Sequence, residues 1–169
     1  NVHLSGKGGP EKFLRTLKKL SPEARNLITI ENDEISNGLD LTLLVSDHVA
    51  LVLDIHHHWV KTGEYITPED DRVQRVLESW RGVRPAMHFS TSREDLLVDH
   101  DTGTRPDLDT LLARGFKKQG LRAHSDFCWN DAVNDWVLTF SPDFDIQVEA
   151  KGKNLATDQL YERYLTKHI

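Results

Sequence analysis

The stretch Leu51-Val52-Leu53-Asp54-Ile55-His56-His57-His58-Trp59 decides both the fold and the hypothesis about the site. Its apolar start predicts a buried strand, and a helix-like segment follows the histidines. Within a strand, Asp54 and His56 would share one face and His57 would point to the other. Where a strand ends and the chain turns, Asp54 could instead converge with His57 or His58 on one ion. Carboxylate plus imidazole suits manganese, zinc or iron; three solvated loop histidines are the alternative.

The composition bounds the class of protein. With 169 residues, 38% hydrophobic and 28% charged, the chain suits one globular domain, which we expect to span residues 1–169. No run approaches the roughly 20 apolar residues that cross a bilayer, so we expect no membrane partner. The single Cys128 excludes an internal disulfide and fits a reducing compartment. The net charge of -6 argues against broad binding of nucleic acid, although ions would neutralise carboxylates gathered at a metal site.

Strand-like and helix-like segments alternate along the chain. Apolar runs predict five strands, at residues 1–5, 27–30, 49–53, 85–90 and 146–149. Helical spacing of apolar residues predicts helices at 11–20, 40–48, 68–82 (with Thr67 as its N-cap), 108–112, 130–140 and 155–165, and Ser21-Pro22-Glu23 predicts a further short helical turn. This alternation predicts the α/β class, with a parallel sheet and helical crossovers. A complete βα barrel needs eight units and about 250 residues, so we expect either an incomplete barrel of about five βα units or an open sheet.

Two features stand outside this alternation. Residues 91–106 form a long polar connection, part of an insertion that extends to about residue 120. A connection of that length inside a domain is usually functional or flexible. The chain also begins with Asn1 rather than Met and opens directly on a strand, which indicates a processed or truncated piece.

Acids and histidines recur at the carboxyl ends of the predicted strands. Those ends meet at one edge of a parallel sheet, where the active sites of βα proteins are built. Every predicted strand ends near a side chain that can bind a metal, and a histidine in a later loop could reach the same edge. The candidate metal ligands are His3, Glu31, Asp54, His57, His88, His124 and Glu149. The remaining histidines outside the triplet, which we expect on the surface, are His48, His100 and His168.

Three carboxylates and four imidazoles exceed what one tetrahedral zinc ion requires. The set suits two or three divalent ions, an arrangement typical of phosphodiester cleavage, in which one ion activates water and the pair stabilises the attacking and leaving oxygens. The residues we assign to catalysis are Glu31, Asp54, His57 and Glu149. Basic side chains near the same edge either bind a phosphate backbone or are solvated surface charges. These candidate DNA-binding residues are Lys7, Arg122, Lys151 and Lys153.

Six segments of the chain occur in the same order, with similar spacing, in UV damage endonucleases. They are Ile30-Glu31-Asn32-Asp33, Leu53-Asp54-Ile55-His56-His57-His58-Trp59, Ser79-Trp80-Arg81-Gly82-Val83-Arg84-Pro85, Met87-His88-Phe89-Ser90, Leu121-Arg122-Ala123-His124-Ser125-Asp126 and Val148-Glu149-Ala150-Lys151. The chain therefore resembles this family over nearly its whole length, as its C-terminal portion.

The resemblance implies a single TIM barrel related to the apurinic-site endonuclease and xylose isomerase-like barrels. It implies a metal-dependent hydrolase that nicks DNA immediately 5′ to ultraviolet photoproducts, namely cyclobutane dimers and 6-4 photoproducts. By the same resemblance the seven candidate ligands hold Mn²⁺, with Zn²⁺ or Mg²⁺ as alternatives. The implied partner is damaged double-stranded DNA, and the implied location is the cytoplasm, at the nucleoid.

The chain departs from the family pattern at two places. The N-terminal strands of the family have no counterpart here, and with them go another ligand histidine and the side chains that probe a flipped lesion. In some members a modifiable lysine lies two positions before the histidine of the fourth strand, where this chain has Ala86. The first departure bears on lesion recognition and activity, and the second on fine adjustment of the metal site.

Two other functions fit the same residues. A sugar isomerase or epimerase of this barrel class would use a similar set of ligands without a basic groove for DNA. An incomplete barrel could also bind metal without cutting DNA, and its exposed sheet edges could pair with another chain.

Within residues 54–59, Asp54 and His57 are the expected ligands. His56 and His58 are expected to support the ligands or face the substrate, and Trp59 to pack in the core.

Overall fold

The computed structural model describes residues 1–4 and 7–168, with side chains described up to residue 166. Five parallel strands form one sheet, in the order in which they follow one another in the sequence. They are β1 (Val2–His3), β2 (Thr29–Glu31), β3 (Ala50–Asp54), β4 (Ala86–Phe89) and β5 (Asp145–Val148). The α/β class and five parallel βα units are therefore confirmed, and all the carboxyl ends of the strands lie at one edge of the sheet.

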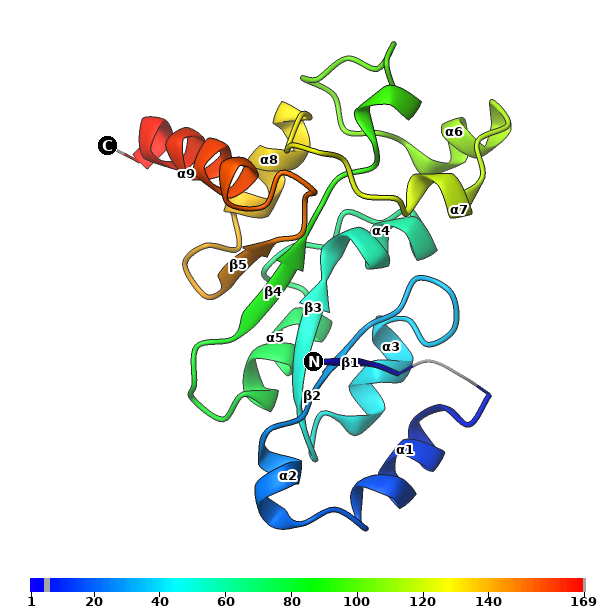
Figure 1. Cartoon of the computed structure of the whole chain (residues 1–169), viewed down its shortest axis with the longest axis vertical. Helices are drawn as coiled ribbons and strands as arrows, with labels where there is room; N and C mark the ends of the chain where they lie inside the picture. Colours follow the sequence, from blue (N-terminus) through cyan, green and yellow to red (C-terminus); the bar gives the residue numbers. More distant parts are fainter. Residues whose placement is uncertain (5–6, 169) are drawn as a thin grey trace.

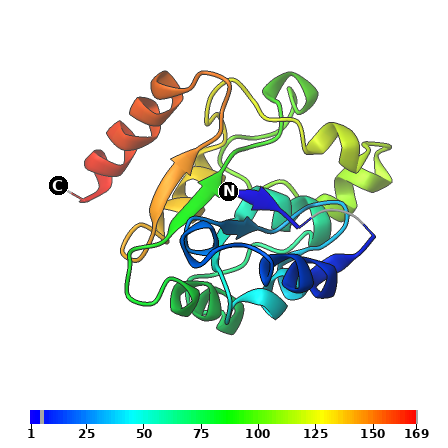
Figure 2. The ribbon, with the colours of Figure 1, turned by 60° about the horizontal axis from the view of Figure 1, so that its bottom comes forward.

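The segments between the strands are mostly helical. The helices are α1 (Gly9–Leu17), α2 (Pro22–Asn26), α3 (Leu39–Thr42), α4 (Ile55–Thr62), α5 (Asp71–Ser79), α6 (Leu108–Ala113), α7 (Lys118–Leu121), α8 (Asp131–Leu138) and α9 (Asn154–His168), with 3₁₀ turns η1 (Leu43–Val45) and η2 (Glu94–Leu96). Figure 1 shows α9 beside α8 and β5, whereas α1 and α2 lie at the far end of the molecule, and Figure 2 agrees. The described helices include none long and apolar enough to cross a membrane.

The two faces of the sheet differ in chemistry. Alternate residues such as Ile30, Leu53 and Phe89 are fully buried in one core, together with apolar side chains of α1, η1, α5 and α8. Burying a side chain of this size stabilises the fold by about 1.5–3 kcal/mol. The intervening residues point to the opposite face, where Ala50 and Ala86 are only partly buried. Glu31, Asp54 and His88 share that second face, so the candidate ligands project away from the apolar core.

The insertion folds back on the rest of the domain. Its apolar residues Leu97, Leu108 and Leu121 form a second cluster with Trp59 and Val60 of α4. Helix α7, which the apolar spacing did not predict, lies at the end of this cluster. At the base of the insertion, the backbone N–H of Ser125 donates to the carbonyl of Thr91 at 3.0 Å. The segment therefore has a packed core of its own and a closed base.

Several predicted boundaries are wrong. The second strand begins at Thr29, because the preceding residues form α2 and leave Leu27 83% exposed just beyond it. The helix expected at 40–48 splits into α3 and η1. Helix α5 begins at Asp71 and is capped by Asp70 rather than Thr67, because the Asp70 carboxylate accepts from the backbone N–H of Arg72. In α9, Leu160 is buried but Leu155 and Tyr161 are 60% and 58% exposed. Leu160 shares its buried face with Tyr164, four residues later, rather than with Leu155 or Tyr161.

Two predictions fall partly on residues whose placement is not described. The first predicted strand ended at Ser5, which lies outside the described residues, as does the side chain of His168. Of the other two histidines expected on the surface, His48 is exposed. His100 is half-buried, with its Nε2 2.8 Å from the carbonyl oxygen of Thr104.

Candidate metal centre

The site begins where β3 passes directly into α4. Asp54 caps the helix, because its Oδ1 accepts a hydrogen bond of 2.8 Å from the backbone N–H of His57. This cap brings the two side chains together, and Oδ2 of Asp54 lies 3.3 Å from Nδ1 of His57. The strand-like alternation of Asp54 with His56 is therefore wrong, and the convergence of Asp54 with His57 is confirmed. His58 lies elsewhere, with its Nε2 3.0 Å from Glu64.

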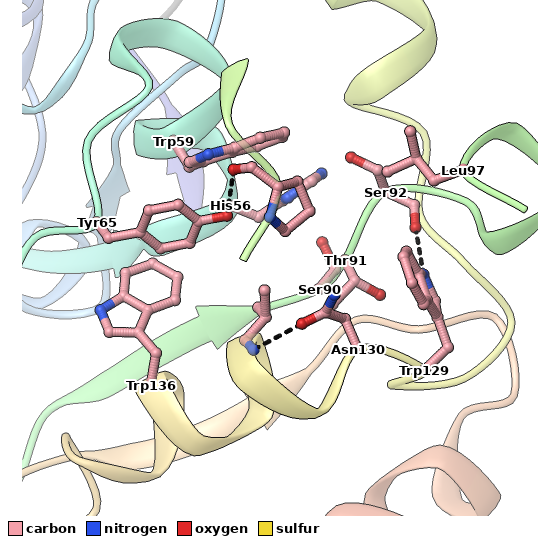
Figure 3. A pocket seen from close by; sticks show the side chains of 12 residues that line it. His56, Trp59, Tyr65, Ser90, Thr91, Ser92, Leu97, Trp129, Asn130 and Trp136 are labelled. Carbon is pink, nitrogen blue, oxygen red and sulfur yellow. Dashed lines mark hydrogen bonds between the residues drawn. The ribbon is translucent and has the colours of Figure 1, made fainter. Parts of the chain in front are cut away.

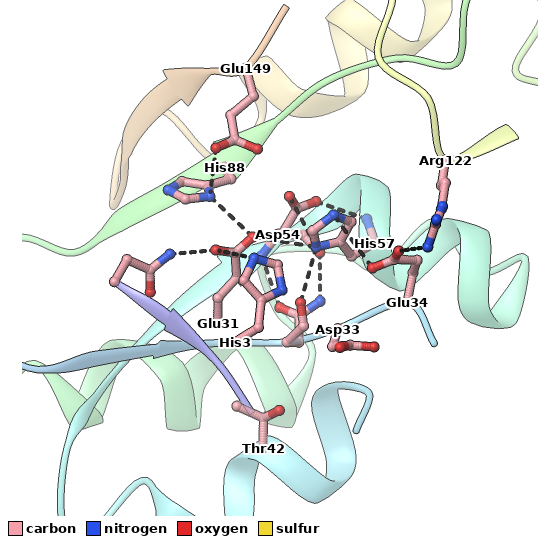
Figure 4. A network of polar contacts seen from close by, with 12 residues as sticks. His3, Glu31, Asp33, Glu34, Thr42, Asp54, His57, His88, Arg122 and Glu149 are labelled. Carbon is pink, nitrogen blue, oxygen red and sulfur yellow. Dashed lines mark hydrogen bonds and ion pairs between the residues drawn. The ribbon is translucent and has the colours of Figure 1, made fainter. Parts of the chain in front are cut away.

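Glu31, at the end of β2, occupies the centre of the cluster (Figure 4). Its Oε1 lies 3.2 Å from Nδ1 of His88 on β4 and 3.3 Å from Nδ1 of His57. Its Oε2 lies 3.4 Å from Nε2 of His3 on β1 and also accepts from the side-chain amide of Asn1. One buried carboxylate therefore faces imidazoles from three other elements.

Glu149 completes the cluster from the end of β5. Its Oε1 lies 3.3 Å from Nδ1 of His88. Two sets of potential ligand atoms result, each with all its atoms within 4.8 Å of one another: Glu31, Asp54, His88 and Glu149 in the first, and His3, Glu31 and His57 in the second. Because Glu31 belongs to both, the geometry suits two neighbouring ions that share one carboxylate.

Three buried atoms of the cluster have no hydrogen-bond partner among the described residues. They are Oε1 of Glu31, Oδ2 of Asp54 and Nδ1 of His88. An unsatisfied buried polar group costs about 1–3 kcal/mol, and more when it is charged. A divalent cation would satisfy carboxylate oxygens and an imidazole nitrogen together, so the residues fit a bound metal ion.

The electrostatics of the cluster follow from burial and close packing. Burial raises the pKa of Asp54 to about 7. Burial also opposes ionisation of Glu31, but the facing imidazoles of His57 and His88 outweigh it and hold the pKa of that carboxyl below its usual range. For His57, burial opposes protonation, yet the carboxylates of Glu31 and Asp54 outweigh it and raise its pKa to about 9. Ligand imidazoles must be neutral, so metal binding would release protons.

His124 lies beside the cluster, next to the base of the insertion, and its ring is oriented by the backbone of Glu149. Its Nδ1 donates to the carbonyl oxygen of Glu149 at 2.8 Å, which leaves the lone pair on Nε2. The neighbouring Ser125 is held by Thr91 through hydroxyl groups 2.7 Å apart. The ring of His124 lies 6.5 Å from that of His57, centre to centre. His124 is therefore at the predicted edge but outside the two close sets of ligand atoms.

The predicted DNA-binding residues differ in their surroundings. Nη1 of Arg122 lies 3.0 Å from Oε1 of Glu34, whose other oxygen is 3.6 Å from Nε2 of His57. Lys151 lies 3.8 Å from Asp126. Lys7 and Lys153 are exposed. Arg122 thus already has a partner beside the cluster, whereas the exposed lysines can reach solvent.

Two residues near the cluster were not predicted. Glu34 and Asn32 both follow β2, and the run of polar residues from 31 to 34 was the only signal for them. Glu34 links Arg122 to His57, as described above. Asn32 is fully buried and contacts the backbone of Asp54.

His56 points away from the close ligand sets, into a pocket on the other side of α4 (Figure 3). Four aromatic side chains, Trp59, Tyr65, Trp129 and Trp136, line part of the pocket, and Ser90, Thr91, Ser92 and Asn130 line another part. Burial lowers the pKa of His56 to about 3. Trp59 is buried here, as predicted. The triplet therefore directs its three imidazoles to three different environments.

Fold and site together define an α/β protein with a candidate metal centre at the carboxyl edge of a parallel sheet. The chain belongs to the UV-endonuclease UvdE family, because the sequence model of that family matches residues 1–168. The resemblance found in the six segments is therefore confirmed.

Individual relatives carry names that agree with this family. The chain is 23% identical to a UV DNA damage endonuclease of Bacillus cereus (strain B4264), over 96% of this chain and 47% of that protein. It is 27% identical to a UV-damage endonuclease of Schizosaccharomyces pombe, over 96% of this chain and 25% of that protein. The chain thus spans about half the length of its bacterial relatives and a quarter of the yeast relative.

Proposed function

We propose that this chain is the metal-binding part of a DNA repair endonuclease, a hydrolase that nicks the phosphodiester bond 5′ to cyclobutane dimers and 6-4 photoproducts. One observation carries the proposal: acids and imidazoles from all five strand ends converge, and three of their buried atoms lack partners among the described residues. The family match favours DNA repair over sugar isomerisation. We also propose that the five βα units form part of a TIM barrel, with the ligands at its carboxyl edge.

The ligand sets suggest how two or three ions would be held. Asp54, His88 and Glu149 would hold one ion and His3 and His57 a second, with Glu31 shared between them. His124 offers its Nε2 to the same edge. Mixed carboxylate and imidazole ligands suit Mn²⁺, and Zn²⁺ and Mg²⁺ are the alternatives. When bound, such ions activate water and stabilise charge on the attacking and leaving oxygens.

The residues around the cluster suit damaged double-stranded DNA as the partner. Lys7, Lys151 and Lys153 are exposed cations that could contact phosphates. Unstacking a base costs least where pairing is already damaged, which would favour a lesion over intact duplex. A DNA substrate also fits a location in the cytoplasm, at the nucleoid.

The direct test is nicking of supercoiled plasmid by the chain with Mn²⁺, with and without prior ultraviolet irradiation. We expect conversion of the irradiated plasmid to the open circle, and no conversion with EDTA. Glu149→Gln and His57→Ala should abolish it. Asp145→Asn is the matched control, because this exposed acid sits at the opposite end of β5 from Glu149. Nicking that survives Glu149→Gln would contradict the assignment of the site.

A second candidate follows from the share of the relatives that the chain spans. With 47% of the bacterial relative matched, the chain could bind metal without cutting DNA by itself, or act as a pair of chains. Mn²⁺ binding without nicking, by a chain that elutes as a monomer, would favour the first of these forms. Nicking that rises with the square of the chain concentration would favour the second.

A further inference from the structure

Asn32 links the end of β2 to the point where β3 becomes α4. The backbone pairing of β2 with β3 stops at Glu31, which lies opposite Val52. Beyond that point the side-chain amide of Asn32 makes the hydrogen bonds to β3 that a continuing strand would otherwise make. Its Nδ2 donates to the carbonyl of Asp54 at 2.8 Å, and its Oδ1 accepts from the backbone N–H of Asp54 at 2.8 Å. Asn32 is 0% exposed, so no water competes for these bonds.

The same residue also contacts the second ligand of the β3–α4 junction. The backbone carbonyl of Asn32 lies 3.1 Å from Nδ1 of His57. Because a carbonyl oxygen only accepts, this contact puts a proton on Nδ1 and orients the imidazole ring. Asn32 therefore fixes the backbone of Asp54 with its side chain and the ring of His57 with its main chain.

We propose that Asn32 is a positioning residue for the metal centre, which sets the relative placement of Asp54 and His57. The inference rests on the proposed metal site. An amide is suited to this role because it donates to a carbonyl and accepts from an N–H at the same time. Groups that orient metal ligands in this way typically change metal affinity by about 10–100-fold when they are removed.

Asn130 supplies a matched control. It is also 0% exposed, and its side chain also bonds the backbone in both directions, donating to Thr104 at 2.9 Å and accepting from Val133 at 2.8 Å. It lies at the start of α8 and belongs to neither set of ligand atoms, although it lines the pocket that His56 enters. Asn32→Ala and Asn130→Ala therefore lose the same kind of hydrogen bonds, and only the first should change the metal centre.

The experiment measures Mn²⁺ affinity by titration calorimetry and by the electron paramagnetic resonance signal of free Mn²⁺, together with the Tm of each metal-free variant. We expect Asn32→Ala to weaken Mn²⁺ binding by at least about tenfold, and Asn130→Ala to leave it within about twofold while lowering Tm. If Asn32→Ala does not fold, Asn32→Leu keeps a similar shape and removes the same side-chain bonds.

The outcomes separate this inference from the proposed function. If the unsubstituted chain binds no Mn²⁺, the proposed metal site and this inference both fail. If it binds Mn²⁺ and Asn32→Ala binds equally well, only the positioning role fails. Equal weakening by Asn130→Ala would also overturn that role, because loss of general stability would then explain the effect.

Discussion

Oε1 of Glu31 lies 3.2 Å from Nδ1 of His88, and neither atom has a hydrogen-bond partner among the described residues. The two side chains come from β2 and β4, on either side of β3 in the sheet. A buried carboxylate and imidazole this close form an ion pair when the imidazole is protonated, and a divalent cation would take the place of that proton.

Mn²⁺ should stabilise the fold. At a free concentration of 100 times the Kd, a ligand that binds only the folded state adds about 2.7 kcal/mol. For a chain of this length that corresponds to a rise of roughly 5–10 °C in Tm. Thermal unfolding monitored by circular dichroism should show this rise, and EDTA should reverse it. Glu31→Gln should abolish the rise, whereas Glu78→Gln on the exposed side of α5 should keep it. An equal rise for Glu31→Gln would contradict the shared-ligand role.

Replacing Asp54 by asparagine should affect the free energy of unfolding and the affinity for Mn²⁺ in different directions. Asp54→Asn keeps a good helix cap and removes a buried charge with an unpartnered oxygen. The free energy of unfolding without metal should therefore stay level or increase, while Mn²⁺ affinity falls. Asp54→Ala loses the cap as well and should be about 0.5–2 kcal/mol less stable than Asp54→Asn. Urea unfolding in the presence of EDTA measures the free energy of unfolding of both variants. A large loss of stability in Asp54→Asn would mean that the charge itself stabilises the fold.

The basic residues should contribute unequally to DNA binding. Each phosphate contact lowers the slope of log K against log salt by about 0.9. Lys153 is exposed, so Lys153→Ala should reduce the magnitude of the slope by about one such contact. Arg122→Ala should change it less, because its guanidinium is paired with Glu34. Fluorescence anisotropy with a lesion-containing duplex at several salt concentrations measures these slopes. Lys19→Ala, an exposed lysine just after α1, is the control. An equal change of slope in that variant would mean that Lys153 acts only as one more surface charge.

Cys128 should be inert in the native state. It is buried, and burial raises the pKa of its thiol from 9.0 to about 12. Because the folded pKa lies above the unfolded value, this group's contribution to stability is complete below pH 9 and is lost as pH rises toward 12. At pH 8 a thiol reagent such as DTNB should react about a hundredfold more slowly than in guanidinium, since the reaction needs local opening. Fast native reaction would show that the surrounding core opens readily.

The sheet and the edge that carries the site could be predicted, because both depend on short-range patterns. Parallel strands share one carboxyl edge, so acids and histidines placed after apolar runs were expected to meet there. Glu31, His88 and Glu149 do so. The partner of Asp54 depended on where α4 begins. Only a helix starting at Ile55 turns His57 back toward Asp54, and the sequence allowed a strand-like continuation equally well.

Contacts between distant segments could not be predicted. The role of Asn32 depends on the register of β2 against β3, which places its amide beside Asp54. The pair of Arg122 with Glu34 joins residues 88 positions apart. The boundary error at Leu27 has a local cause, because Leu27 is the C-terminal cap of α2, the short helix that Ser21 begins. Intrinsic propensity alone did not decide whether Leu27 lies at the end of a helix or in a strand.

The closed base of the insertion has an evolutionary consequence. Residues 91 and 125 are joined by backbone and hydroxyl bonds, and the ring of the adjacent His124 is oriented by the carbonyl of Glu149. The exposed residues between Leu97 and Leu108 lie outside the apolar cluster that packs on α4, so they can change with little effect on the imidazole at the metal edge. Loop insertions of this kind cost little in closure entropy. That exposed stretch is thus a place where the outer surface can change while the packed residues beneath it stay the same.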